Sequence, residues 1–134
     1  NQGYTSFIAI VARVSKQDGA IKVEKLTCVV DCGLAVSPGG VEEQIYGGLM
    51  WGLGHALFDR LDIKQGRVVQ SNFHDYRVTR MSDMPEVDIL LVEGDPAKPG
   101  GVGELGSPSV APAIANALFS LTGVRQRSTP LNLG

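Results

Sequence analysis

Alternating apolar and polar residues predict two strands at the start of the chain. Residues 4–15 alternate and are rich in Phe, Ile and Val, and the alternation resumes over residues 20–31. A period of two is typical of a half-buried strand. Between the two segments, Asp18 and Gly19 form the Asp-Gly pair that favours a tight hairpin turn. We therefore expect the two strands to pair antiparallel.

A four-residue spacing of apolar residues predicts a helix over residues 41–58, after a loop at residues 32–40. The segment also contains four glycines, and each costs up to about 1 kcal/mol relative to alanine inside a helix. Something must therefore approach this helix closely, either a sheet or second helix or, as the alternative, a bound cofactor. The apolar stripe is Val41, Ile45, Leu49, Leu53 and Leu57, and the glycines are Gly47, Gly48, Gly52 and Gly54.

The second half of the chain predicts a hairpin, a strand, a long loop and a final helix. The helix is expected to begin between Ser107 and Pro112 and to end at Gly123, which suits the position just past a helix. The other expected elements are a hairpin over residues 60–70, a polar irregular segment at 71–83, a strand at 86–92, a loop at 93–106 and a short strand at 124–128. This order predicts an α+β fold with a mostly antiparallel sheet and two packed helices.

Composition narrows the class of protein. The chain has 134 residues, 43% of them hydrophobic, and a net charge of −2. No basic face for nucleic acid is visible, and no apolar run approaches the roughly 20 residues that span a bilayer. The chain begins without Met and enters a strand pattern at once. We therefore expect residues 1–134 to be one piece of a longer polypeptide, whose targeting signals would lie elsewhere, so the compartment stays unknown.

The two cysteines do not predict a metal site. Cys28 and Cys32 are four positions apart, whereas structural zinc and iron–sulfur sites usually need four ligands. Cys28 lies in an apolar strand, where a thiol behaves as a small hydrophobic group. We expect both cysteines to be inert and structural.

One carboxylate within a glycine-rich loop is the strongest candidate for chemistry. Glu104 lies among four glycines in residues 100–106, just before the final helix. Glycine lets a backbone approach a ligand, and a carboxylate held there is a candidate general base. The N–H groups of Gly101, Val102 and Gly103 are candidate contacts to a ligand. The alternative is that Glu104 only favours the dipole of the following helix.

Other polar residues are weaker candidates for a functional site. His55 lies off the main apolar stripe, and surface exposure is the simpler interpretation than metal binding. His74 and Asp75 form either an oriented base or a polar loop that makes its own turns. Gln44, at the start of the first helix, is a candidate amide donor to a ligand, although exposed glutamines are common there.

Several motifs together resemble the C-terminal end of the molybdopterin-binding large subunit of the xanthine dehydrogenase and aldehyde oxidase family, and most closely the branch of isoquinoline 1-oxidoreductase beta subunits. The resemblance runs nearly end to end. The motifs that carry it are Val30-Asp31-Cys32-Gly33, Gln44-Ile45-Tyr46-Gly47-Gly48, Ser71-Asn72-Phe73-His74-Asp75-Tyr76, Gly100-Gly101-Val102-Gly103-Glu104 and Ala111-Pro112-Ala113-Ile114-Ala115-Asn116-Ala117.

The resemblance implies that Glu104 is the base beside molybdenum in a hydroxylase that oxidises an N-heteroaromatic or an aldehyde. Water would supply the oxygen, and electrons would leave through [2Fe–2S] clusters on a partner subunit or domain. Gln44 would line the pterin. The implied partners are the rest of the large subunit and an iron–sulfur small subunit.

Two points qualify this implied function. Leu105 stands where relatives commonly have Pro, and most cofactor-binding residues would lie upstream. The isolated residues 1–134 are therefore expected neither to hold the cofactor tightly nor to turn over. The alternative from another class is a non-catalytic α+β binding or assembly module, in which Glu104 only caps or bridges.

Overall fold

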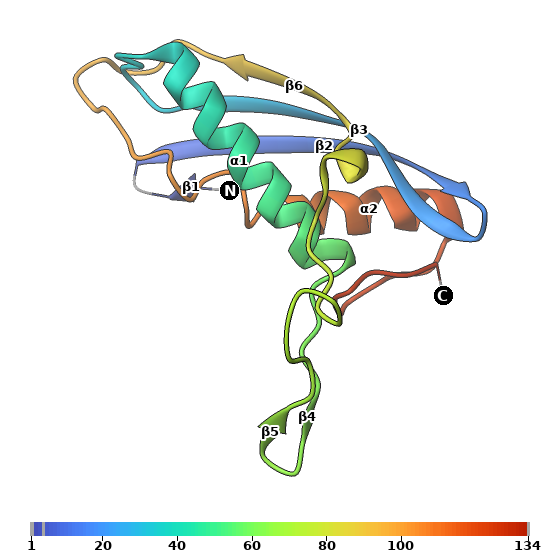
Figure 1. Ribbon diagram of the computed structural model, residues 1–134. Helices are drawn as coiled ribbons and strands as arrows, with labels where there is room; N and C mark the ends of the chain where they lie inside the picture. Colours follow the sequence, from blue (N-terminus) through green and yellow to red (C-terminus); the bar gives the residue numbers. More distant parts are fainter. Residues whose placement is uncertain (1, 4, 134) are drawn as a thin grey trace.

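A four-stranded sheet forms one layer of the protein (Figure 1). The computed structural model describes residues 2, 3 and 5–133. The strand order is β1 (Gln2–Gly3), β2 (Ser6–Gln17), β3 (Ala20–Asp31) and β6 (Glu86–Leu91). The pairs β1–β2 and β2–β3 are antiparallel, whereas β6 runs parallel to β3. The predicted α+β class with a mostly antiparallel sheet is confirmed.

The predicted hairpin between β2 and β3 is present. Asp18 and Gly19 both have positive φ, 51° and 77°, as a two-residue type I′ turn requires. The turn sets the register up to Val14, and a one-residue shift between Arg13 and Val14 then places Ile8 opposite Val30 and Ile10 opposite Cys28. All four side chains therefore lie on the same face of the sheet and join one core.

Two helices, α1 (Pro38–Leu57) and α2 (Val110–Thr122), cover that face. α2 contacts β2, α1 contacts β6, and the helices contact each other. α1 begins three residues before the predicted start because Pro38, with its fixed φ, occupies the first turn. α2 ends at Gly123, whose φ of 72° confirms the predicted glycine cap. Neither helix in the described part of the chain is long and apolar enough to cross a membrane.

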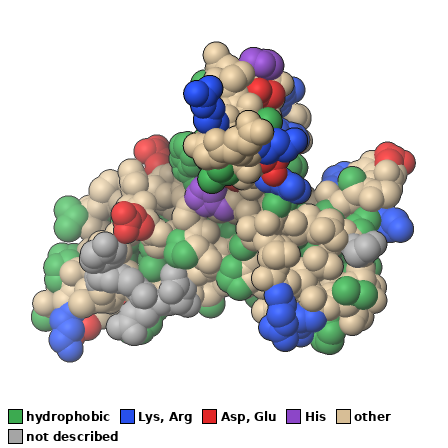
Figure 2. All heavy atoms as spheres, turned by 90° about the horizontal axis from the view of Figure 1, so that it is seen from below, with side chains coloured by type: hydrophobic (Ala, Val, Ile, Leu, Met, Phe, Trp, Pro, Cys, Tyr) green, Lys and Arg blue, Asp and Glu red, His purple; other side chains and the backbone are tan. Residues whose placement is uncertain are grey.

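A hairpin arm projects from the body between α1 and β6 (Figure 1). It contains β4 (Ile63–Lys64) and β5 (Arg67–Val68), so the second predicted hairpin is confirmed, with shorter strands. Residues 71–80 are irregular, as expected, and a short 3₁₀ turn (Met81–Asp83) leads into β6. Figure 2 shows blue basic and red acidic side chains gathered on the projecting part.

The predicted terminal strand at residues 124–128 is wrong. These residues form no strand, and Arg125 instead lies over the Phe119 ring and donates to Asn116 Oδ1 at 2.8 Å. Further on, the Leu131 N–H donates to the Ala56 carbonyl at 2.7 Å, and the Leu131 side chain is buried. The tail is thus tied to α1 and α2 rather than to a sheet edge.

Candidate functional site

The loop that carries Glu104 is anchored on both sides of this residue. Four residues before it, the Gly100 N–H donates to the Cys32 carbonyl at 2.9 Å. Near its end, the Ser107 hydroxyl donates to the Gly48 carbonyl of α1 at 3.0 Å. Residues 100–107, at the end of the predicted long loop, are therefore fixed between the end of β3 and the middle of α1. We call this segment the strap.

Glu104 lies within a tight turn of this strap. The Leu105 N–H donates to the Val102 carbonyl at 3.4 Å and closes the turn. Val102 packs against the core and Leu105 is buried, whereas Gly103 and Glu104 between them are exposed. Apolar burial on both sides therefore turns the glycine and the carboxylate outward. Leu105 fixes the loop by burial at the position where the family resemblance predicts Pro.

Gly103 and Glu104 face an open cleft of about 610 Å³ between the strap and α1. The strap lines one wall, and α1 lines the other with Gln44, Gly48, Trp51 and His55. These four residues are spaced as one stripe along the helix, beside the buried stripe of α1. Trp51 and His55 were missed as site residues, although this spacing was readable from the sequence.

Glycines on the two walls fall into two groups. A Cβ added to Gly48 would lie 3.1 Å from the strap, and one added to Gly52 would lie 2.5 Å from the strap and 2.7 Å from α2. Close packing therefore explains glycine at both positions. At Gly47 and Gly103, no atom beyond the adjacent residues and the local helix backbone lies within 4 Å of an added Cβ, and both residues line the cleft. The protein itself gives no packing reason for glycine at these two positions.

The structure brings together three of the five predicted site residues, namely Gln44, Gly103 and Glu104. Val102 supports the turn from the core side, and Gly101 is exposed outside the residues that line the cleft. α2 begins six residues after Glu104, so Glu104 is not in the first turn of the helix. Interaction with the helix dipole therefore does not explain this carboxylate.

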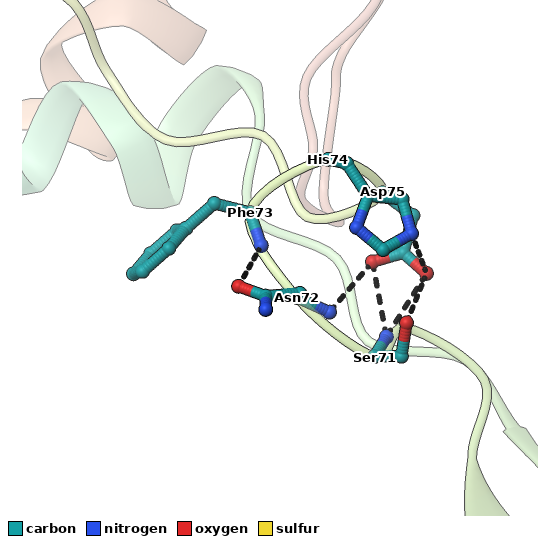
Figure 3. A network of polar contacts seen from close by, with 5 residues as sticks. All are labelled: Ser71, Asn72, Phe73, His74 and Asp75. Carbon is teal, nitrogen blue, oxygen red and sulfur yellow. Dashed lines mark hydrogen bonds and ion pairs between the residues drawn. The ribbon is translucent and has the colours of Figure 1, made fainter.

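His74 and Asp75 form a self-contained turn on the exposed surface (Figure 3). The Asp75 carboxylate accepts hydrogen bonds from the Ser71 N–H at 2.9 and 3.0 Å and from the Asn72 N–H at 3.0 Å. These backbone hydrogen bonds hold the pKa of Asp75 below its usual value. His74 lies 3.7 Å away as an exposed partner. The prediction of a polar loop that makes its own turns is confirmed.

The cysteines are both buried and free. Burial raises the pKa of the Cys28 thiol to about 11, which disfavours the reactive thiolate. Across residues 2, 3 and 5–133, no group of three or more His, Cys, Asp or Glu side chains is placed to hold a metal ion.

Comparison with known proteins identifies the family of this chain. The family model of the molybdopterin cofactor-binding domain matches residues 2–85. The chain belongs to this family. The matched residues include the α1 wall of the cleft and end before the strap that carries Glu104.

Relatives of this molybdopterin cofactor-binding domain are oxidoreductases. Isoquinoline 1-oxidoreductase subunit beta of Brevundimonas diminuta is 39% identical over 126 residues, covering 92% of this chain and 16% of the relative. A membrane-bound aldehyde dehydrogenase of Gluconacetobacter polyoxogenes, whose name specifies pyrroloquinoline quinone, is 40% identical over 118 residues (88% and 15%). The chain thus spans about a sixth of the length of these relatives.

A solved structure shares the fold. The aldehyde oxidoreductase from Desulfovibrio gigas superposes with a TM-score of 0.77 at 31% identity, covering 90% of this chain and 14% of that one. The prediction of a molybdopterin-binding oxidoreductase family is therefore confirmed.

Proposed function

We propose that residues 1–134 are the C-terminal part of the large subunit of a molybdenum hydroxylase, with Glu104 as its general base. The observation that supports this is the placement of Glu104 in the turn between Val102 and Leu105, facing a cleft whose other wall belongs to the family-matched segment. The substrate would be an aldehyde or an N-heteroaromatic, the classes that the relatives' names give. Electrons would pass to [2Fe–2S] clusters on an iron–sulfur partner subunit.

The residues of the cleft fit a molybdopterin. Gly47 and Gly103 leave space where a side chain would otherwise stand, so a flat ligand can lie close to both walls. The Gln44 amide, exposed on the α1 wall, would donate to the pterin. Of the predicted backbone donors, Gly103 lines the cleft, and its N–H group would contact the cofactor's oxygen atoms.

The bound molybdenum cofactor would supply two-electron oxidation chemistry. Glu104, as a carboxylate, would accept a proton from a water-derived O–H group, and loss of that proton makes the oxygen nucleophilic. The turn contributes by positioning. Because Leu105 is buried, the backbone that carries the Glu104 side chain is fixed. The remainder of the large subunit would cover part of the open side of the cleft.

The deciding experiment is Glu104→Gln in the intact holoenzyme. We expect turnover to fall by at least about 10², the usual range for loss of a general base, with molybdenum content unchanged. Glu93→Gln is the matched control, because Glu93 is exposed on the same loop and lies outside the residues that line the cleft. Near-normal turnover of Glu104→Gln favours the alternative, a non-catalytic binding or assembly module.

Three further measurements test the oxygen source, the cofactor and the need for the rest of the large subunit. Turnover in ¹⁸O-labelled water is expected to place the label in the product. Metal analysis of the holoenzyme is expected to find molybdenum, and recovery of pyrroloquinoline quinone instead would exclude this cofactor assignment. The isolated residues 1–134 are expected to show no turnover and no stoichiometric molybdopterin binding.

A further inference from the structure

His55 and Asp59 join two neighbouring cavities at the end of α1. His55 Nε2 lies 3.4 Å from Asp59 Oδ2, one helical turn further along the chain. His55 lines the Glu104 cleft, whereas Asp59 lines a second cavity of about 330 Å³ between α1 and residues 73–79. Trp51 lines both cavities, and its ring centroid lies 6.4 Å from that of His55. The imidazole thus lies near both a carboxylate and an indole ring.

This arrangement defines what each ring nitrogen can do. A carboxylate beside Nε2 favours the tautomer that carries its proton there, so Nδ1 is left as an acceptor. The His55 side chain is 59% exposed and that of Asp59 only 19%. The imidazole therefore reaches water, while the carboxylate that orients it is largely sheltered.

Among the residues that line the two cavities, His55 is the only histidine. Four other ionisable residues line the two cavities: Glu43 of α1, Glu104 of the strap, Asp59 just after α1 and Tyr76 after the hairpin arm. Neither lining set contains Lys or Arg.

We propose that His55, oriented by Asp59, carries the proton that Glu104 removes out of the cleft to solvent. This inference rests on the proposed function of Glu104. The proton passes from the Glu104 carboxyl group, through water in the cleft, to Nδ1 of His55. This restores the Glu104 carboxylate and forms an imidazolium stabilised by Asp59. The imidazolium then releases the proton to bulk water, and no electrons move in either transfer.

The test uses the intact holoenzyme with His55→Gln, Asp59→Asn and the control His74→Gln. His74 has the same kind of carboxylate partner but lies outside both cavities. His55→Gln is expected to lower kcat at neutral pH at least about tenfold, because solvent replaces the relay only partly. It should also remove the acid-side inflection of the kcat profile, and added imidazole should restore the rate in proportion to its concentration. His74→Gln should leave rate and profile unchanged.

Asp59→Asn supplies a second, independent readout. It keeps the imidazole and removes the carboxylate that orients it, so kcat at neutral pH should fall, though less than in His55→Gln. An unchanged kcat profile in His55→Gln would overturn the relay. So would a loss that imidazole does not restore, or one accompanied by lost molybdenum or a lower melting temperature.

The relay and the proposed function fail in different ways. Near-normal turnover in Glu104→Gln would remove the base and, with it, the proposed function. Loss of turnover in Glu104→Gln together with wild-type behaviour of His55→Gln would remove the relay alone.

Discussion

Gly52 of α1 lies directly against Val110, the first residue of α2: a Cβ on Gly52 would stand 2.7 Å from Val110 Cγ2 and 2.5 Å from the Ser107 carbonyl oxygen. A second approach occurs on the strap, where a Cβ on Gly106 would lie 2.8 Å from a carbonyl oxygen of α1. The helices can meet this closely only because both positions lack a side chain. This contact fixes residues 106–110 and, through them, the turn that carries Glu104.

Gly52→Ala is expected to destabilise the protein although alanine is the better helix former. The gain in helix propensity is at most about 1 kcal/mol, whereas overpacking costs about 1–3 kcal/mol. One of the atoms that the new methyl would meet is a backbone oxygen, which cannot rotate away. The free energy of unfolding should therefore fall in a denaturant titration, and wild-type stability would contradict the packing described above.

Gly47→Ala tests whether glycine is needed at this position for a bound cofactor to come close, and not for packing within the protein. No atom beyond the adjacent residues and the local helix backbone lies within 4 Å of its added Cβ, so the cofactor-free subunit should keep its stability or gain up to about 1 kcal/mol. The methyl would enter the cleft, and molybdenum content per subunit should fall. Gly39→Ala is the matched control, because Gly39 also lies in α1 with open space at its Cβ but outside the cleft. Equal molybdenum content in both variants would contradict the proposed site.

The local parts of the fold could be predicted because local chemistry determines them. Asp18 with Gly19 specifies a type I′ turn, and Gly123 ends α2, since both need positive φ. The apolar spacing of α1 gave its buried face correctly through Ile45, Leu49 and Leu53. In each case the controlling residues lie within a few positions of the feature.

The parts that could not be predicted depend on distant residues. β6 pairs with β3 in parallel across a separation of more than fifty positions, which leaves no mark on its own alternation. Residues 124–128 contain a single strong strand former, Val124, and Arg125 contacts Phe119 and Asn116 on α2 instead. Tertiary contacts override a weak local preference there.

The candidate site was only partly readable for the same reason. Glu104 and Gln44 stood out by residue type, and the structure brings both to one cleft. Gly47 and Gly52 look alike in the sequence, yet one faces the cleft and the other faces α2. Only the packing of the strap and α2 on α1 distinguishes them.

Acid should loosen the turn at residues 71–75 selectively. The pKa of Asp75 is lowered by hydrogen bonds from the backbone of Asn72 and Ser71. A folded-state pKa below the unfolded value gives stability that is fully present above the unfolded pKa and is lost as pH falls through the folded pKa. The amide resonances of Ser71 and Asn72 should therefore shift only below about pH 4, the ordinary range of an Asp carboxyl. In Asp75→Asn, which has no group to protonate, this shift should be absent.

Both cysteines should resist alkylation in the folded protein. Cys28 is fully buried and Cys32 is 3% exposed, and burial raises the pKa of Cys28 to about 11. The thiolate is the reactive form, so at mildly alkaline pH both access and ionisation oppose the reaction at Cys28. Iodoacetamide followed by mass measurement should leave the native protein unlabelled and label both thiols in denaturant. Labelling of Cys28 under native conditions at a rate close to that in denaturant would mean that the contact between the sheet and the two helices opens far more often than its packing implies.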